Sequence, residues 1–123
     1  MKFNILFLGL CSLTFVACAQ LDEAKIKQHI KILSSDSLQG RGVGSEGEKM
    51  AAAYIESQFK KLKLQPKGVN NDFRQSFPFK GGVHGTGAEG TGNNLIAFLD
   101  NKAAYTVIIG AHYDHLGLGE NGR

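Results

Sequence analysis

The clearest pattern of hydrophobic and polar positions lies between residues 45 and 64. Ser45 and Glu48 open this stretch with the S-x-x-E spacing of a capping box, which marks the start of a helix. Pro66 and Gly68 follow it and are typical helix stops. The apolar positions that share one helical face are Ala51, Tyr54, Ile55, Phe59 and Leu62. The pattern therefore predicts an amphipathic helix that runs to about residue 64.

A second helix is predicted before it, over residues 21–33. Asp22 and Glu23 place negative charge in its first turn, where the helix dipole favours an anion. Its apolar positions, spaced i, i+4 and i+7, are Ile26, Ile30 and Leu33. Between the two helices, SSDSLQGRGVGSEG contains four glycines and several serines, so it is expected to be a loop.

The second half of the chain predicts strands. Residues 73–79 read as a strand with Phe73, Phe77 and Phe79 on one face, and Pro78 favours a sheet edge. Residues 80–92, with six glycines, are expected to form a loop.

Two further strands, residues 93–100 and 105–111, are predicted on either side of Asp100-Asn101-Lys102. Both are apolar at successive positions, so we expect both of their faces to be covered. Two helices followed by such strands indicate one α/β domain with a central sheet.

Residues 1–17 are predicted to be a signal peptide. Lys2 precedes an apolar run that is too short to span a bilayer permanently but has the length of a secretory segment. Val16-Ala17-Cys18 resembles a bacterial lipobox, which would make Cys18 the lipidated first residue of the mature chain; cleavage of an ordinary signal peptide near Ala19 is the alternative. The protein is therefore expected in the cell envelope, anchored by lipid. The outer membrane is preferred, because Ala19 is not the Asp that favours inner-membrane retention. If Cys18 is not lipidated, the protein is expected to be periplasmic or secreted.

Composition limits the function classes. Removing 17 of the 123 residues leaves 106, enough for one modest core. The net charge is only +3, with both signs interspersed, which is no electrostatic footprint for a nucleic acid. Cys11 lies in the removed part and Cys18 would carry lipid, so no thiol is left for a disulfide.

The candidate chemistry lies at the end of the last predicted strand. His112 follows residues 105–111 at the carboxyl end of a strand, where α/β sheets place their ligands. Asp114, two residues on, would lie on the same side of an extended chain and could accept the second ring N–H of His112. A neutral imidazole supported by a carboxylate suits Zn²⁺. The same pair could also be purely structural, in a lipid-anchored binding or scaffolding domain.

The surrounding sequence resembles the M28 family of zinc peptidases. Gly-Ala-His-Tyr-Asp-His is similar to that family's first metal motif, and LSSDSLQGRGVGSEGEKMAAAYIESQFKKLKLQPKG and NNLIAFLD are similar to its N-terminal region and a following strand. Together the matches run from about Leu33 to Gly117. The resemblance implies a three-layer α/β/α domain with a mixed central sheet, two zinc ions, peptide substrates and aminopeptidase activity. It makes His112 a zinc ligand and Asp114 the residue that orients it.

The resemblance also implies residues that this sequence lacks. The family's bridging Asp and general-base Glu follow the metal motif, but after Asp114 the only carboxylate is Glu120, in a context that does not match. We therefore expect residues 18–123 to be the N-terminal portion of a longer peptidase, inactive by itself and a weak zinc binder. The oligomeric state, and whether the enzyme removes residues from the amino or the carboxyl end, stay open.

Five other residues bear on the assignment. A metallo-β-lactamase-like hydrolase, a lesser alternative, would need a histidine at Gly110 and a fold that opens with strands. Arg41 is expected to hold the loop before the second helix by pairing with a carboxylate or a helix end. His115 has no expected role beyond a local hydrogen bond or a rim position, and His29, like His84, is expected to be a surface or packing residue.

Overall fold

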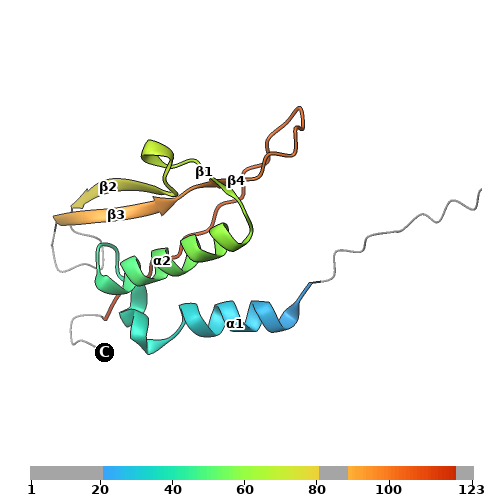
Figure 1. The fold of residues 1–123 in the computed structure, drawn as a ribbon. Coiled ribbons are helices and arrows are strands. Elements are labelled where there is room, and N and C mark those ends of the chain that lie inside the picture. Colours follow the sequence, from blue (N-terminus) through green and yellow to red (C-terminus); the bar gives the residue numbers. More distant parts are fainter. Residues whose placement is uncertain (1–20, 81–88, 119–123) are drawn as a thin grey trace, which may run out of the picture.

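The structure, a computed structural model, describes residues 21–80 and 89–118. Its elements are α1 (Glu23–Leu33), the 3₁₀ helix η1 (Asp36–Arg41), α2 (Glu46–Lys61), β1 (Gln65–Pro66), the 3₁₀ helix η2 (Val69–Asn71), β2 (Arg74–Lys80), β3 (Glu89–Leu95) and β4 (Ala97–Phe98). In Figure 1, α2 lies between the β2–β3 pair and α1. Cys18, His84 and Glu120, on which predictions were made, lie outside the described residues.

Both predicted helices are present, and a side chain caps the start of each. Asp22 precedes α1 and its carboxylate accepts the N–H of Lys25 at 3.1 Å. Ser45 precedes α2 and its hydroxyl accepts the N–H of Glu48 at 3.1 Å. These bonds satisfy N–H groups that have no partner inside the first turn of a helix. The Ser45 half of the predicted capping box is therefore confirmed, whereas the Glu48 carboxylate turns into the protein instead of back to the cap.

The end of α2 differs from the prediction at one position. Leu62, expected on the buried face, follows the last helical residue and is 68% exposed. It lies at the C-cap, beyond the part of α2 that faces the core. The neighbouring lysines Lys60, Lys61 and Lys63 are also exposed.

The strand predicted over residues 73–79 is confirmed as β2, which pairs antiparallel with β3. The start of β3 at Glu89 corrects the prediction of a loop through residue 92. Gly90 and Gly92 stand opposite Phe79 and Phe77, and a Cβ at either glycine would come within 2.8 Å of the facing ring. The glycines thus belong to a strand because they leave room for aromatic rings on the neighbouring strand.

The strand predicted over residues 93–100 is divided between two sheets. Its first part ends β3, and its second part, β4, pairs antiparallel with β1 through Gln65↔Phe98 and Pro66↔Ala97. Between them, the N–H of Ile96 bonds to the carbonyl of Phe73 at 2.8 Å. The chain therefore changes partners at Ile96.

A small core lies between α2, η1 and β2. The buried apolar residues are Leu38, Ala51, Ala52 and Phe73. The ring of Phe73 lies 5.7 Å from that of Phe59 on α2, a typical aromatic pair distance. At the edge of this core, Glu56 on α2 pairs with Lys60 at 2.5 Å and with Arg74 of β2 at 3.1 Å. The two cations, Lys60 foremost, lower the pKa of the Glu56 carboxyl.

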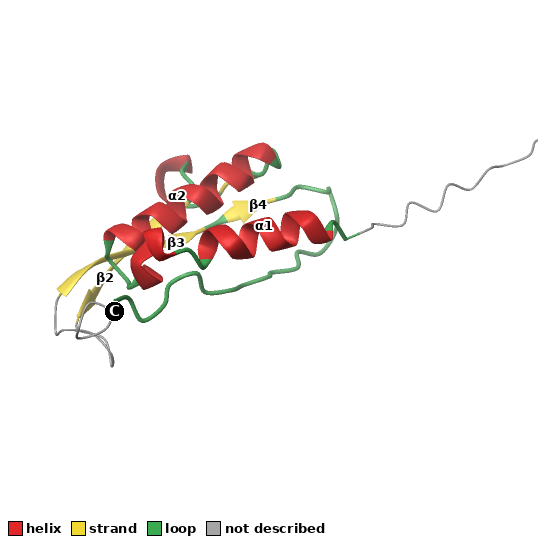
Figure 2. Cartoon of the chain, turned by 90° about the horizontal axis from the view of Figure 1, so that it is seen from below, coloured by secondary structure: helices red, strands yellow, loops and turns green. Residues whose placement is uncertain are grey.

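The prediction of a strand over residues 105–111 is wrong. The segment makes no backbone hydrogen bond to another described residue. Ile108 and Ile109 are 90% and 93% exposed, so the expected cover on both faces is missing. A strand needs a neighbour for its N–H and C=O groups, and in the described part of the chain β4 pairs only with β1. The segment runs as a loop past α1 in Figure 2.

The fold is accordingly a small mixed α/β arrangement. It has two two-stranded antiparallel sheets, β1–β4 and β2–β3. The α/β class predicted from the sequence is present, but the described residues form no clear three-layer sandwich and no mixed central sheet.

Gly47 is expected to be a sensitive position in this core. It lies in the first turn of α2, and a Cβ there would be 1.8 Å from the carbonyl oxygen of Leu38 in η1. Gly47→Ala should force η1 away from α2 and lower the free energy of unfolding by about 1–3 kcal/mol, as overpacking does. Denaturant unfolding followed by circular dichroism would measure the loss. Gly110→Ala is the matched control, because a Cβ at Gly110 meets nothing within 4 Å; equal stability losses in the two variants would contradict the explanation.

Candidate functional site

The candidate site lies where residues 113–117 run beside the end of η1 and the loop that follows it. The N–H of His115 bonds to the carbonyl of Arg41 at 2.9 Å, and the N–H of Gly117 bonds to the carbonyl of Gly40 at 3.0 Å. Gly42 and His115 form a parallel bridge. A Cβ at Gly40 would lie 2.3 Å from the carbonyl oxygen of Gly117, so this contact requires glycine.

Arg41 joins three parts of the chain at this point. Its Nε donates to the carbonyl of Tyr113 at 2.7 Å. Its Nη1 donates to the carbonyl of Leu33, the last residue of α1. The prediction that Arg41 holds the loop by pairing with a helix end is confirmed, since a helix leaves its last carbonyls without partners.

His112 is 83% exposed, and its ring is oriented by a local hydrogen bond. Its Nδ1 lies 2.9 Å from the main-chain carbonyl oxygen of Asp114. Because a carbonyl can only accept, Nδ1 must carry the proton in this bond, which leaves the Nε2 lone pair free. The carboxylate of Asp114 is farther away, with Oδ1 at 3.7 Å from the same nitrogen. The residue predicted to orient His112 thus contacts it, but the atom at hydrogen-bond distance is the carbonyl oxygen.

Tyr113 and Glu48 are functional candidates that the sequence reasoning missed. The hydroxyl of Tyr113 lies 2.5 Å from Oε1 of Glu48 and 2.5 Å from the carbonyl oxygen of Asn93. The N–H of Asn93 also donates to Oε1 of Glu48, at 3.3 Å. Burial raises the pKa of the Tyr113 phenol well above its ordinary value of 10.0, and the Glu48 carboxylate raises it further. The phenol therefore keeps its proton and can donate it.

Glu48 itself is 1% exposed, and its Oε2 has no hydrogen-bond partner among the described residues. In the sequence, the capping box already explains this glutamate, so its pattern gives no sign of a second role. The available signal for Tyr113 was alternation along an extended chain. If His112 and Asp114 face outward, Tyr113 between them faces inward.

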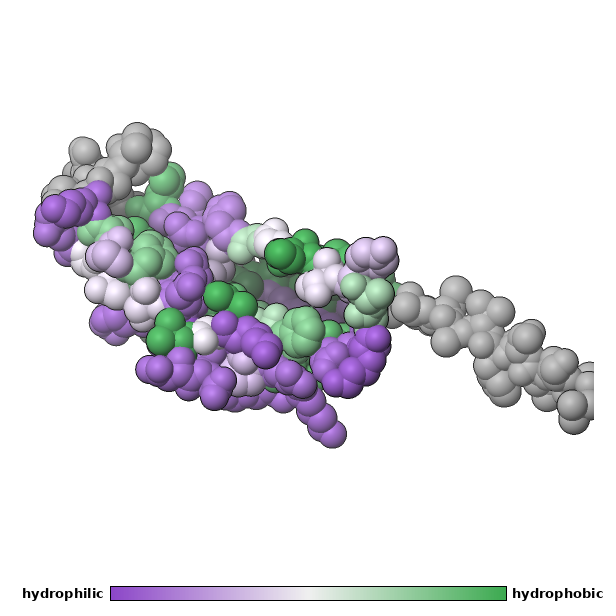
Figure 3. Space-filling view, turned by 90° about the horizontal axis from the view of Figure 1, so that it is seen from above, coloured by the Kyte–Doolittle hydropathy of each residue, from purple (hydrophilic) through white to green (hydrophobic). Residues whose placement is uncertain are grey.

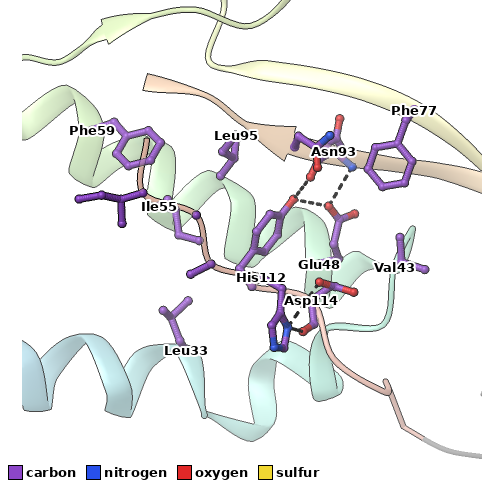
Figure 4. A pocket seen from close by; sticks show the side chains of 15 residues that line it. Leu33, Val43, Glu48, Ile55, Phe59, Phe77, Asn93, Leu95, His112 and Asp114 are labelled. Carbon is purple, nitrogen blue, oxygen red and sulfur yellow. Dashed lines mark hydrogen bonds and ion pairs between the residues drawn. The ribbon is translucent and has the colours of Figure 1, made fainter. Parts of the chain in front are cut away.

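A cavity of about 510 Å³ opens beside this cluster. Its wall is mostly apolar, with polar groups contributed by Glu48, Asn93, His112 and Asp114, and Figure 4 shows His112 and Asp114 beside one another on it. The apolar lining residues include Leu33, Ile55, Phe59, Phe77 and Leu95. From above, the surface of the molecule is hollowed near its middle, with hydrophobic residues among hydrophilic ones around the hollow (Figure 3).

The described residues provide only part of a metal site. No three His, Cys, Asp or Glu side chains within residues 21–80 and 89–118 lie close enough together to hold a metal ion. His112 fits zinc as one donor, because its Nε2 is free and its ring is held. His115 is bound through its main chain and its side chain is not part of this cluster. His29 bonds through Nδ1 to the hydroxyl of Tyr54 at 2.6 Å, which confirms its expected packing role.

Comparison with known proteins adds no further assignment. Searches against protein-family models, curated proteins and solved structures each find no match for this chain. In the part of the chain that the structure describes, no helix has both the length and the apolar character needed to cross a membrane.

Proposed function

We propose that the chain is part of a zinc-dependent peptidase in which His112 supplies one metal ligand. The observation that carries this proposal is the state of the His112 ring. It is exposed at the wall of a largely apolar cavity, its Nδ1 is tied to Asp114, and its Nε2 is free to bind a metal. Metal-ligating histidines commonly have such a partner on their second nitrogen.

The residues of this chain would have separate tasks in such a site. His112 would hold one of two zinc ions, and Asp114 would fix the orientation of the ring and place negative charge behind it. The zinc ions would supply an activated water and polarise the peptide carbonyl. The apolar wall of the cavity suits a nonpolar side chain of a peptide substrate. The remaining ligands, the bridging Asp and the general-base Glu, would come from residues other than those described, and aminopeptidase activity follows only from the family resemblance.

A larger sheet belongs to the same proposal. Residues 105–111 are apolar and unpaired among the described residues. Additional strands and helices around this segment would satisfy its backbone and cover its side chains, giving the three-layer α/β/α domain with a mixed central sheet that the resemblance implies.

A second candidate function is a lipid-anchored binding or scaffolding domain without catalysis. The observation that favours it is that the bond between His112 and the Asp114 carbonyl is complete without a metal. A metallo-β-lactamase-like site receives less support, because Gly110 occupies the position of the first histidine and α1 opens the fold.

Metal content separates these functions. The complete gene product should be purified without affinity metals, and its zinc should be measured by mass spectrometry together with hydrolysis of aminoacyl and peptide substrates. The peptidase proposal expects two zinc ions per protein and hydrolysis that stops on chelation. Protein that folds without zinc and cleaves no peptide would favour the binding domain instead. In the coding sequence, an Asp-Asp-Asn-like segment followed by Glu-Glu after residue 123 would also support the peptidase.

Lipidation of Cys18 is the corresponding proposal for localisation, and it rests on Val16-Ala17-Cys18 after a short apolar run. Expressed in a Gram-negative host, the protein should appear in the membrane fraction with an acylated mass beginning at Cys18. Cys18→Ser should release it to the periplasm or stall its processing. Cys11→Ser is the matched control and should leave the membrane-bound product unchanged. An unacylated mature protein beginning at Ala19 or later would show that an ordinary signal peptide is cleaved.

A further inference from the structure

We propose that Tyr113 is a positioning residue, fixed by Arg41 and Glu48, that holds the His112 ring in the orientation needed to bind a metal. The inference rests on the proposed function of His112 as a ligand. It assigns roles to Tyr113, Glu48 and Arg41, all of which lie outside the pair His112 and Asp114.

Two consecutive peptide groups behind His112 are held by one residue. The carbonyl of Tyr113, in the first peptide group, accepts a hydrogen bond from Nε of Arg41. The N–H of His115, in the second, donates to the carbonyl of Arg41. Arg41 thus forms hydrogen bonds to the chain on both sides of Asp114, one through its side chain and one through its main chain.

The second of these peptide groups contains the atom that orients the imidazole. The carbonyl of Asp114 and the N–H of His115 belong to the same planar trans unit, in which C=O and N–H point in opposite directions. Because the N–H is directed at Arg41, the carbonyl oxygen is directed away from it, and that oxygen lies 2.9 Å from Nδ1 of His112. The orientation of the ring therefore depends on the orientation of this peptide plane.

Tyr113 prevents residues 112–115 from rotating about the chain axis. Side chains alternate along an extended chain, so an inward Tyr113 keeps its two neighbours outward. The Tyr113 hydroxyl is anchored at the far end by Glu48 of α2 and the carbonyl of Asn93 of β3 (Figure 4 draws these bonds). A residue held by both its hydroxyl and its carbonyl has little freedom to twist about the chain axis.

The burial of Glu48 fits a role in fixing the position of the Tyr113 ring better than a role in stabilising the core. A carboxylate that is 1% exposed, with one oxygen lacking a partner among the described residues, loses solvation that its remaining bonds only partly replace. An apolar residue of similar size would avoid that loss. What Glu48 adds is a defined acceptor at 2.5 Å from the Tyr113 hydroxyl, which fixes the position of the ring that carries it.

The test compares Tyr113→Phe with Asp22→Ala in the metal-free full chain. Tyr113→Phe keeps the aromatic ring and deletes only the anchored hydroxyl. Asp22→Ala removes the cap of α1, which should lower the midpoint of unfolding, and the Asp22 carboxylate bonds to Lys25, away from Tyr113, Glu48 and His112. Nitrogen-15 chemical shifts of the His112 ring report which nitrogen carries the proton, and a zinc titration followed by the same signals reports the affinity.

The wild-type ring should carry its proton on Nδ1. Tyr113→Phe should convert it to a mixture of the two tautomers and weaken zinc binding at His112 by roughly 10-fold, the lower end of the range for groups behind a metal ligand. Glu48→Gln should shift the ring in the same direction by less, because the amide keeps one acceptor oxygen. Asp22→Ala should lower the midpoint of unfolding and leave the ring signals in place.

Each other outcome separates the two proposals. Unchanged ring signals in folded Tyr113→Phe would overturn the positioning role while leaving zinc binding by His112 intact. If Tyr113→Phe does not fold, unchanged His112 ring signals in Glu48→Gln would overturn the positioning role in the same way. An equal shift of the ring signals in Asp22→Ala would show that the effect comes from a general loss of stability, and it would overturn the positioning role. A ring that responds to Tyr113→Phe but takes up no zinc would sustain the positioning and contradict the proposed function.

Discussion

Replacing His112 by alanine in the complete gene product is expected to remove metal from one of the two zinc positions and to reduce peptide hydrolysis to background. The imidazole has a free nitrogen and a ring that is held by a hydrogen bond, so it can act as a metal donor. Alanine leaves nothing that can take its place, since the described residues bring no three His, Cys, Asp or Glu side chains together. Zinc content by mass spectrometry and initial rates on peptide substrates would be measured side by side.

Asp114→Asn should have a smaller effect of a different kind. The substitution leaves the main-chain carbonyl that accepts from Nδ1 of His112, so the ring keeps its orientation. It removes only the negative charge 3.7 Å from that nitrogen. We therefore expect a loss of roughly 10-fold, at the low end of the 10–100-fold range for such partners, with zinc still loaded at high concentration.

The matched control for this comparison is Asp100→Asn, the same chemical change at a turn where the carboxylate bonds to the main chain of Lys102. It should leave zinc content and rate unchanged. Full activity in His112→Ala would remove this residue from the metal site. A loss in Asp114→Asn as large as that in His112→Ala would show that the carboxylate contacts the metal directly.

Local sequence signals predicted the elements whose stability is local. The capping box at Ser45, the acidic start of α1 and the apolar spacing of α1 and α2 identify helices because a helix satisfies its backbone within one segment. Residues 93–100 and 105–111 have equally strong apolar patterns, but a strand also requires a partner. The pattern cannot specify that partner, so the first segment is divided between β3 and β4 and the second has no pairing among the described residues.

The candidate site was predictable to a similar extent. His112 and Asp114 are adjacent in sequence, and their contact follows from a separation of two residues. The attachment of Arg41 to a helix end was expected from its place in the segment between α1 and α2. The contact between Glu48 and Tyr113 joins residues 65 positions apart, and it depends on how α2 lies against the end of the chain. No spacing rule covers such a contact.

The unpaired segment 105–111 leads to the second large expected effect, self-association of the 123-residue chain on its own. Ile108 and Ile109 are almost fully exposed, and the segment's backbone has no partner among the described residues. An apolar, uncharged extended segment in this state is a template for pairing with another chain. Each apolar side chain left in water forgoes about 1.5–3 kcal/mol, against a typical domain stability of about 5–15 kcal/mol. We therefore expect marginal stability and concentration-dependent association.

Ile108→Lys should suppress this association, because a charge on the exposed segment opposes pairing between copies. It should leave the midpoint of unfolding nearly unchanged, since the side chain it replaces is 90% exposed. Sedimentation velocity over a range of concentrations measures the association, and Leu62→Lys is the control, because Leu62 is also exposed but lies at the end of α2. Association that persists in Ile108→Lys and disappears in Leu62→Lys would place the contact at the helix end. A wild-type chain that stays monomeric and unfolds cooperatively above about 60 °C, within the upper mesophile range, would mean that the described core is sufficient without any cover over residues 105–111.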